Sequence, residues 1–228
     1  MDARSRDGLL ESVKFDGAGL VPAVAQDHLT GEVRMVAFMS REALALTLAT
    51  GEAHFHSRSR GRLWKKGETS GHTLAVRRVF LDCDGDCVLL HVDPAGPTCH
   101  TGAPSCFTRV AGEETWREAP PPDSAVAELE AVVAARRDDP AATGRSYTRA
   151  LLDGGAEKIG AKLREEADEL ARAVAGESAE RVAAEAADVI YHLVVAVASR
   201  RVAWRTVLAE LARRAGTSGL VEKASRSR

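Results

Sequence analysis

Every cysteine of the chain falls in one short part of the sequence, and these thiols are the residues best suited to chemistry. Cysteines in a chain without an export signal more often bind metal than form disulfides, and thiolates are preferred zinc ligands. Three thiols would leave one zinc position open to water, as catalysis requires, whereas four would close a structural site. Spacing alone leaves both alternatives open for Cys83, Cys87, Cys99 and Cys106.

An acidic run overlaps the first cysteine. Asp82, Asp84 and Asp86 alternate along the chain. If the preceding strand continues, their side chains share one face and Cys83 points to the other. Three carboxylates this close repel one another unless a hard cation such as Mg²⁺ neutralises them. A calcium loop of the EF-hand type is disfavoured, because its sixth position is Cys87 rather than glycine. A solvated acidic turn is the other alternative.

Ahead of the acidic run, residues 57–72 combine basic side chains, hydroxyls and glycines. Such a composition can bind phosphate, and an exposed basic hairpin is the alternative. Trp64 is able to stack on a purine or to cover the core. His100, which follows Cys99, is a candidate ligand, general base or packed histidine. The candidate substrate-binding residues are Arg58, Arg60, Trp64, Lys66, Thr69 and Ser70.

Acidic residues recur at helical spacing in the second half of the chain. Glu166 and Glu169 flank the apolar stripe of one expected helix, and a second acidic pair flanks the stripe of the next. Two such ridges facing each other would bind Mg²⁺, which can hold a polyphosphate and activate water. A solvated glutamate-rich face is the usual alternative. The predicted ligands are Glu165, Glu166, Glu169, Glu185 and Asp188, of which Glu166 and Glu169 are also the predicted catalytic carboxylates.

Two kinds of structure must position these residues. In the first half, glycines interrupt short stretches rich in β-branched and aromatic residues, which is typical of strands. We therefore predict an α+β, β-rich domain over residues 1–113. Examples of the expected short strands are residues 53–57, 73–81 and 88–93, and one expected helix over 41–49 begins after Ser40 and stops at Gly51.

Three consecutive prolines mark a boundary, because they exclude a regular helix and favour an extended spacer. We place a linker over residues 114–124. Beyond it, alanine, glutamate and arginine dominate and apolar residues return at helical spacing, which predicts an all-α bundle over residues 125–228. The expected helices cover residues 125–137, 146–153, 156–175, 178–200 and 203–215.

Composition argues against several classes of protein. With 31 basic and 33 acidic side chains the net charge is −2, so no global positive field exists to attract nucleic acid or an anionic membrane. The first residues lack the apolar run of an export signal, and the apolar stretch 189–198 is shorter than the roughly 20 residues that span a bilayer. We expect a cytoplasmic protein with small-molecule partners. A structural zinc staple with a nucleic-acid loop is disfavoured.

Several motifs of the first half, taken in order, resemble those of phosphoribosyl-AMP cyclohydrolases. The resemblance extends along nearly the whole of this half. It rests on Gln26-Asp27, Thr30-Gly31-Glu32-Val33, Ser57-Arg58 with Arg60, Leu63-Trp64 with Lys66-Gly67-Glu68-Thr69-Ser70-Gly71, Asp82 to Asp86, Cys99-His100-Thr101-Gly102 and Ser105-Cys106-Phe107.

This resemblance implies an enzyme that opens the purine ring of phosphoribosyl-AMP at N1–C6. It implies Mg²⁺ on the three aspartates and zinc on three thiols, Cys83, Cys99 and Cys106, the first coming from the partner subunit of a homodimer. Zinc suits the reaction because it lowers the pKa of a bound water. His100 is the candidate for proton transfer. Cys87 is not required by the family, and His72 stands where the family usually has asparagine.

The second half resembles phosphoribosyl-ATP pyrophosphohydrolases, a branch of the all-α nucleoside triphosphate pyrophosphohydrolases. The resemblance implies Mg²⁺-assisted release of pyrophosphate from phosphoribosyl-ATP, which yields the substrate of the first half within histidine biosynthesis, with Lys162 binding substrate. The alternative is a generic nucleotide pyrophosphatase joined to the cyclohydrolase. The matching residues are Ser146-Tyr147-Thr148, Lys158-Ile159, Lys162, Glu165-Glu166, Glu169, Glu185, Asp188 and Tyr191-His192-Leu193.

Overall fold

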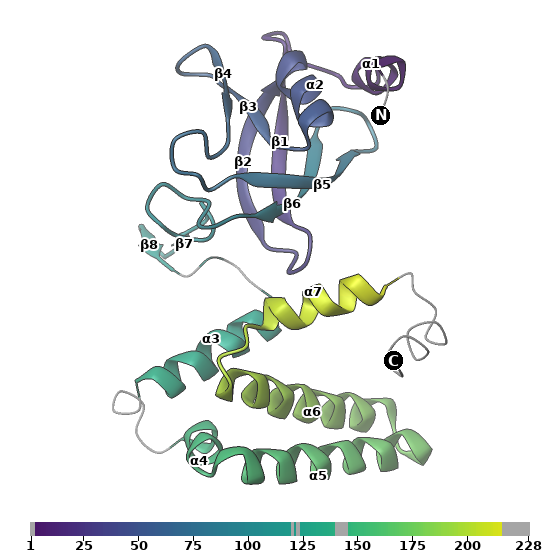
Figure 1. Cartoon of the computed structure of the whole chain (residues 1–228), viewed down its shortest axis with the longest axis vertical. Coiled ribbons are helices and arrows are strands. Elements are labelled where there is room, and N and C mark those ends of the chain that lie inside the picture. The colour runs from purple at the N-terminus through teal and green to yellow at the C-terminus, as the bar shows by residue number, and fades with distance from the viewer. Residues whose placement is uncertain (1–2, 120, 122–123, 140–145, 216–228) are drawn as a thin grey trace, which may run out of the picture. The chain divides into compact units, whose positions relative to one another are not determined.

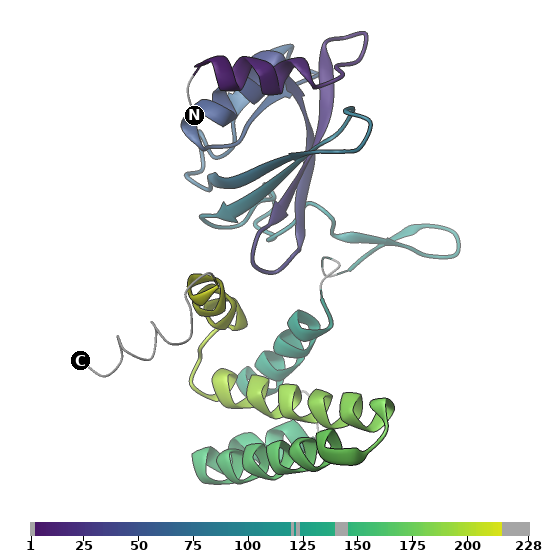
Figure 2. The same cartoon turned by 90° about the vertical axis from the view of Figure 1, so that its right-hand side faces the viewer.

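The chain divides into two compact units, Met1–Asp123 and Ser124–Arg228. The structure is a computed structural model and describes residues 3–119, 121, 124–139 and 146–215. Figures 1 and 2 show a curved sheet accompanied by helices in the first unit and a group of helices in the second. The hydrophobic clusters of the two units share no residue. Each unit therefore has a core of its own.

A six-stranded sheet forms the first unit, in the order β4-β3-β2-β1-β6-β5. The central strands β1 and β6 run parallel, and the other neighbours are antiparallel. The predicted β-rich character is confirmed, and β3, β5 and β6 agree with the strands given as examples from the sequence. The strands are β1 (Leu20–Asp27), β2 (Val33–Ser40), β3 (His54–Ser57), β4 (Arg62–Lys65), β5 (Leu74–Leu81) and β6 (Val88–Pro94).

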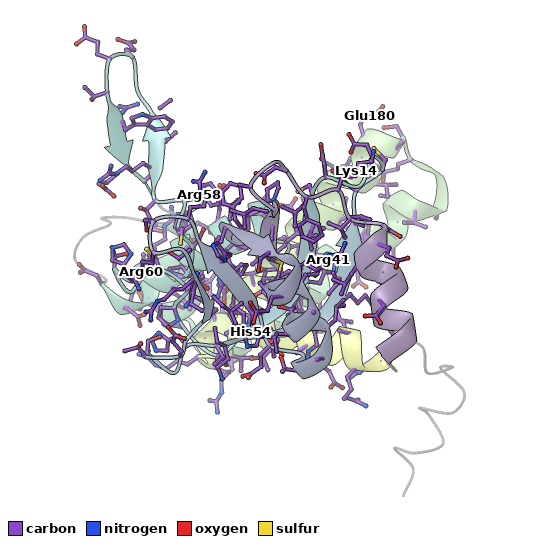
Figure 3. The ribbon with its side chains drawn as sticks, turned by 90° about the horizontal axis from the view of Figure 1, so that it is seen from above. Lys14, Arg41, His54, Arg58, Arg60 and Glu180 are labelled. Carbon is purple, nitrogen blue, oxygen red and sulfur yellow. The ribbon has the colours of Figure 1, made fainter. Side chains whose placement is uncertain are left out.

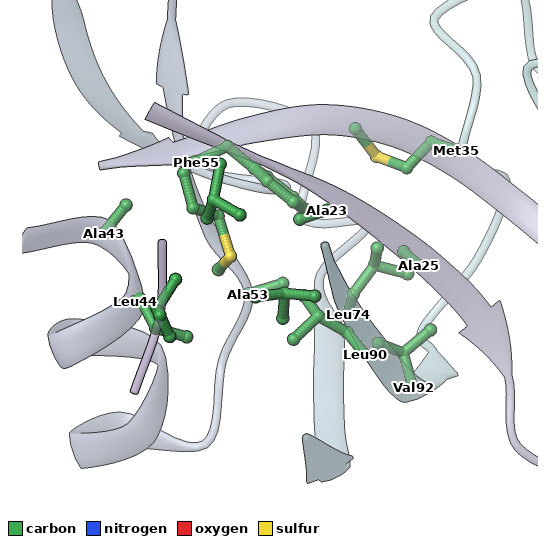
Figure 4. Close-up of a cluster of buried hydrophobic side chains, with 14 of the residues drawn as sticks. Ala23, Ala25, Met35, Ala43, Leu44, Ala53, Phe55, Leu74, Leu90 and Val92 are labelled. Carbon is green, nitrogen blue, oxygen red and sulfur yellow. The ribbon is translucent and has the colours of Figure 1, made fainter. Parts of the chain in front are cut away.

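Two helices, α1 (Ala3–Glu11) and α2 (Arg41–Thr50), complete the core of the first unit. α2 begins where predicted because the Ser40 hydroxyl accepts a hydrogen bond from the third amide of the turn (3.2 Å). It ends at Gly51, whose φ of 72° favours glycine. Figure 4 shows Leu44 of α2 among the buried side chains of the sheet.

The acidic run does not continue a strand, contrary to the prediction. β5 ends at Leu81, and the chain then turns through Gly85, which has a φ of 85°. The Asp82 carboxylate accepts hydrogen bonds from the amides of Gly85, Asp86 and Cys87 at 3.0, 2.9 and 3.0 Å. Hydrogen bonding of an aspartate to its own following backbone competes with strand pairing. The turn replaces the strand for this reason.

A two-stranded hairpin follows the sheet. Its strands are β7 (Arg109–Ala111) and β8 (Trp116–Glu118), and residues 109–118 are called the β7–β8 arm below. All of its paired residues are exposed. β8 lies inside the range expected to be an extended spacer, so regular structure reaches further than the sequence predicted. Residues 120, 122 and 123 of that spacer lie outside the described residues.

Five helices form the described part of the second unit, and the predicted all-α bundle is confirmed. Their bounds agree with the expected ones to within one or two residues. Serine caps explain where three of these helices begin, because Ser124, Ser146 and Ser178 each accept a hydrogen bond from an amide in the first helical turn. The helices are α3 (Ala125–Asp138), α4 (Tyr147–Asp153), α5 (Gly155–Gly176), α6 (Ala179–Ser199) and α7 (Trp204–Arg214).

Among the described helices, α6 alone is long and apolar enough to cross a membrane by length and composition. Its side chains Val194, Val195 and Ala198 belong to the hydrophobic core of the second unit. The same helix buries Glu185 and His192. α6 is therefore a core helix of the bundle and not a membrane span.

Loss of one buried side chain should weaken only the unit that contains it. Phe55→Ala removes a fully buried ring and is expected to cost the first unit about 3–5 kcal/mol. Leu151→Ala, the matched control in the second unit, should cost about 2–5 kcal/mol there. Hydrogen exchange resolved along the chain, with circular dichroism to follow the helices, measures each unit. Equal loss of protection in both units from either change would contradict independent cores.

Two candidate active sites

Cys99 and Cys106 lie together in the loop between β6 and β7. The amide of Cys106 donates to the carbonyl of Arg34 in β2 (2.9 Å). The Ser105 hydroxyl donates to the carbonyl of Val33 in the same strand (2.7 Å). Hydrogen bonds from Thr101 lower the pKa of the Cys99 thiol, whereas burial and the charge of Cys99 raise the pKa of the Cys106 thiol. A lowered pKa favours the thiolate, which is the form that binds zinc.

A pocket of about 570 Å³ adjoins the two thiols. Lys66 is buried in its wall, where its ammonium donates to the carbonyl of His72 (3.1 Å). Burial lowers the pKa of Lys66, and the negative charge of the nearby thiols partly offsets this. Trp64 packs on the core residue Phe55, with ring centroids 5.3 Å apart, and also lines the pocket. The predicted residues that line it are Arg60, Trp64, Lys66, Thr69, Ser70, Cys99, His100 and Cys106.

His100 is exposed and lies at the border of this pocket. Its Nδ1 is 3.8 Å from the sulfur of Cys99. The side chain is therefore not a packed core histidine, which was one of three alternatives for it. A position beside one thiol and open to solvent suits a group that exchanges protons with a substrate.

Arg58 does not line the pocket beside the thiols. Its guanidinium stacks over the ring of Phe38, 4.0 Å from the centroid, and it lines a neighbouring depression of about 350 Å³. Arg60 and Trp64 line both hollows. Figure 3 labels Arg58 and Arg60 on the same loop. The basic loop therefore borders two adjacent depressions rather than one.

Cys83 lies far from the other two predicted zinc ligands. Cys83 follows the last residue of β5, at the end of the sheet where β1 begins. Cys106 is hydrogen-bonded to β2 at the opposite end of the sheet, where β1 ends. β2 and β5 are also three strands apart in the sheet, which is about 14 Å at the usual spacing. Sulfurs that share a zinc ion lie within about 4 Å of one another. One chain therefore brings together only Cys99 and Cys106.

The three predicted aspartates do converge, although through a turn. Carboxylate oxygens of Asp82, Asp84 and Asp86 all lie within 4.8 Å of one another. The charge of Asp84 raises the pKa of Asp86, while backbone hydrogen bonds, chiefly from the Cys87 amide, lower that of Asp82. The raised pKa reports repulsion that a bound cation would relieve. This all-oxygen donor set fits a hard divalent cation such as Mg²⁺.

Glu166 of α5 meets Glu185 and Asp188 of α6 in the helical unit. Their carboxylate oxygens lie within 4.8 Å of one another, and both glutamates are buried. Oε2 of Glu185 is buried and has no hydrogen-bond partner within the described part of the chain. A buried carboxylate oxygen without a partner is costly, and a divalent cation between the three carboxylates would satisfy it. The donor set fits Mg²⁺.

Two cations of the protein itself contact this acidic cluster. The ammonium of Lys162 lies 2.9 Å from Glu166 and 3.0 Å from Glu165. Arg181 contacts Glu185 at 2.5 Å. The two glutamates raise the pKa of Lys162. Lys162 thus lies at the predicted site, where it pairs with two of the predicted ligands. The sequence analysis missed Arg181, which the sequence indicates only by its spacing of four residues from Glu185.

Two of the five predicted ligands in the helical unit stand apart from the cluster. Glu165 is exposed and pairs with Lys162, and Glu169 lies 3.5 Å from Arg172. Neither belongs to the group whose oxygens converge, which contains Glu166, Glu185 and Asp188. The structure therefore brings three of the five predicted ligands together.

A buried histidine lies beside the acidic cluster and contacts residues of it. His192 Nδ1 lies 2.9 Å from the carbonyl of Asp188 and 3.8 Å from Oε1 of Glu166. Because a carbonyl only accepts hydrogen bonds, Nδ1 carries the proton, and Nε2 then accepts from the Tyr147 hydroxyl at 3.1 Å. The hydrogen bond between Tyr147 and His192 thus holds α4 against α6, beside the acidic cluster.

Two family matches divide the chain in the same way as its cores. Residues 35–108 match the phosphoribosyl-AMP cyclohydrolase family, and residues 126–215 match the phosphoribosyl-ATP pyrophosphohydrolase family. The class of protein is therefore a bifunctional hydrolase built from two enzyme families that use metal ions.

Relatives with the same two-part construction identify the family. The histidine biosynthesis bifunctional protein HisIE of Parasynechococcus marenigrum is 45% identical over 211 residues, or 91% of this chain and 94% of that protein. Its counterparts in Wolinella succinogenes and Caldanaerobacter subterraneus are each 41% identical, over 96% and 90% of this chain and 97% of each relative. The chain belongs to this HisIE family of histidine biosynthesis.

The chain accordingly carries out two consecutive steps of histidine biosynthesis. It hydrolyses phosphoribosyl-ATP to phosphoribosyl-AMP and pyrophosphate, and it opens the purine ring of phosphoribosyl-AMP at N1–C6 to give the formimino carboxamide ribotide. The alternative of a generic nucleotide pyrophosphatase in the second half is set aside, because that half matches the phosphoribosyl-ATP pyrophosphohydrolase family.

Gly67 should be indispensable to the pocket beside the thiols. Its φ is 84°, and an added Cβ would lie 2.5 Å from the backbone carbon of His72. Gly67→Ala must displace the turn that carries Lys66, so we expect ring opening to fall at least about 10-fold. Gly51→Ala is the matched control, because Gly51 has a φ of 72° but open space around it. Similar rates of phosphoribosyl-AMP consumption in both variants would contradict this account.

Proposed function

We propose that the ring-opening activity resides in a domain over residues 1–113 and the release of pyrophosphate in a domain over residues 125–228, with 114–124 as the linker. The two family matches, at 35–108 and 126–215, support this division. Separate hydrophobic cores support it too. The product of the second domain is the substrate of the first. The partners are these small molecules rather than nucleic acid or a membrane, and we place the enzyme in the cytoplasm.

We assign zinc to Cys99 and Cys106 of one subunit together with the partner subunit's Cys83. The separation of Cys83 from the other two thiols within one chain is the observation that carries this proposal. Two-fold symmetry then gives a homodimer with two equal sites. Cys87 is left out, so one position of the metal stays open. Zinc bound there would supply a water whose pKa is near neutrality.

The other residues around the pocket bind and orient the substrate in this proposal. Lys66, Thr69 and Ser70 supply a cation and two hydroxyls suited to a phosphate, and Arg58 and Arg60 extend that positive surface into the neighbouring depression. The exposed face of Trp64 offers a stacking surface for the purine. His100 transfers a proton at the ring as the N1–C6 bond breaks. Mg²⁺ on Asp82, Asp84 and Asp86 completes the metal set.

In the helical domain we assign Mg²⁺ to Glu166, Glu185 and Asp188, with Glu165 and Glu169 as further ligands. The unpartnered oxygen of Glu185 is the observation that carries this assignment. Bound Mg²⁺ would neutralise the polyphosphate and bring it beside water. Glu166 and Glu169 are assigned to catalysis as the carboxylates that orient the attacking water. Lys162, once released from the glutamates, binds the polyphosphate.

The identity of the zinc ligands can be tested on the cysteines. Cys106→Ala should lose zinc and ring opening, because two remaining thiolates do not form a tight site. Cys87→Ala should keep the zinc stoichiometry and the rate. Pyrophosphate release should survive both changes. Metal analysis with separate assays of the two steps is the measurement, and equal zinc loss from both variants would favour a closed four-thiol site instead.

The magnesium ligands of the helical domain can be tested with glutamate-to-glutamine substitutions, which remove the negative charge and keep the size of the side chain. Glu185→Gln should lower pyrophosphate release by at least about 100-fold, since even residues that only orient a ligand typically cost about 10–100-fold. Glu166→Gln should behave alike, and both variants should open phosphoribosyl-AMP at the normal rate. The exposed Glu157→Gln at the beginning of α5 is the matched control. Loss of ring opening in a folded Glu185→Gln protein would argue against two separable sites.

A further inference from the structure

Tyr147, the first residue of α4, exposes its ring while the protein holds its hydroxyl. The residue is 52% exposed, yet its hydroxyl lies 3.1 Å from Nε2 of His192, which is buried. Amphipathic side chains at a protein surface usually have the reverse arrangement, with the apolar body against the protein and the polar tip in water. The part of Tyr147 that faces solvent is therefore mainly its aromatic ring.

Neighbouring side chains on α6 and α3 fix the orientation of this ring. Tyr191 lies nearly parallel to it, with an interplanar angle of 18° and ring centroids 6.1 Å apart. The Tyr191 hydroxyl is 2.8 Å from the Thr148 hydroxyl, which accepts a hydrogen bond from Arg136 at 2.7 Å. The His192 ring meets Tyr147 edge to face, with centroids 5.9 Å apart. A side chain that is already fixed loses little conformational freedom when a ligand binds to it.

The same ring lies close to the carboxylates proposed to bind magnesium. His192, which bonds to the Tyr147 hydroxyl, is 3.8 Å from Oε1 of Glu166. Burial raises the pKa of Tyr147, and the positive charge of Lys162 lowers it while the negative charge of Glu166 raises it further. Tyr147 therefore lies within electrostatic reach of the acidic cluster and of the lysine that pairs with it.

We propose that the purine base of phosphoribosyl-ATP stacks on the exposed ring of Tyr147 during the release of pyrophosphate. The inference rests on the magnesium site proposed above, which places the reacting phosphates beside Glu166. One ribose separates the base of a nucleotide from its α-phosphate, so a surface for the base must lie near the metal ligands but not among them. Tyr147 meets this requirement, because it is joined to the cluster through His192. Exposed aromatic faces bind bases by stacking.

This contact gives Tyr147 a role in selecting the substrate. Magnesium and basic side chains recognise the polyphosphate, which all nucleoside triphosphates share. A stacking surface adds affinity for the part of the substrate that carries the base. Pyrophosphate has no base, so the contact holds phosphoribosyl-ATP in place and offers nothing to the pyrophosphate that is released.

Substitutions at Tyr147 in the full-length protein separate binding of the base from binding of the phosphates. Tyr147→Leu removes the aromatic face and should raise the KM for phosphoribosyl-ATP at least about 5-fold. Inhibition of pyrophosphate release by tripolyphosphate with Mg²⁺ should be unchanged, because this probe has no base. Tyr147→Phe keeps the face and should behave nearly as wild type. Leu211→Ala is the matched control, at a position 55% exposed on α7, which Figures 1 and 2 show across α6 from α4.

Two results would overturn the stacking contact. One is a wild-type KM in Tyr147→Leu, and the other is an equal weakening of phosphoribosyl-ATP and tripolyphosphate, which would mean that Tyr147 only supports the carboxylates through His192. Glu185→Gln tests the magnesium site separately, because it should weaken inhibition by tripolyphosphate. If it does not, the magnesium assignment fails, whereas a selective rise in the KM of Tyr147→Leu would still support stacking. Circular dichroism shows that the helices of each variant are intact.

Discussion

Mutual repulsion among anionic ligands is the constraint on which both sites depend. Carboxylates or thiolates held within a few ångströms raise one another's energy unless positive charge is near. In the helical unit the compensation comes from Lys162 and Arg181, which contact Glu166 and Glu185. Beside the thiols it comes from buried Lys66. The chain thus brings the proposed metal ligands together with cations of its own.

The two units hold their ligands by different means. In the helical unit the ligands project from the facing sides of α5 and α6, so the packing of two helices sets their positions. In the β-rich unit they lie on loops, and backbone hydrogen bonds fix the loops to strands, as for Cys106 on β2. A loop can reach only the strand end where it emerges. For this reason the sheet separates Cys83 from the other thiols, whereas the bundle gathers its carboxylates within one chain.

Local sequence signals predicted local structure well. The features that the sequence did not predict are mostly those that depend on contacts between distant parts of the chain. Caps such as Ser40 and Ser178 fixed helix bounds, because a hydroxyl near the first amides acts within one turn. The acidic run was wrongly expected to extend β5, since alternation suited a strand until Asp82 bound its own following amides. Burial of Glu166 and the distance of Cys83 from Cys106 depend on tertiary packing and topology, which periodicity does not contain. The β7–β8 arm lacked any buried face to signal it.

The counter-ions of the helical cluster determine whether the bundle needs a metal ion in order to fold. Because Lys162 and Arg181 pair with the two buried carboxylates, Glu166 and Glu185, the magnesium proposed for this cluster is not needed to neutralise them while the bundle folds. Loading then becomes an exchange in which a divalent ion displaces side-chain cations that stay tethered nearby. With magnesium assigned to this cluster as proposed, metal occupancy is uncoupled from folding, so a shortage of the ion would stop this half of the enzyme without unfolding it.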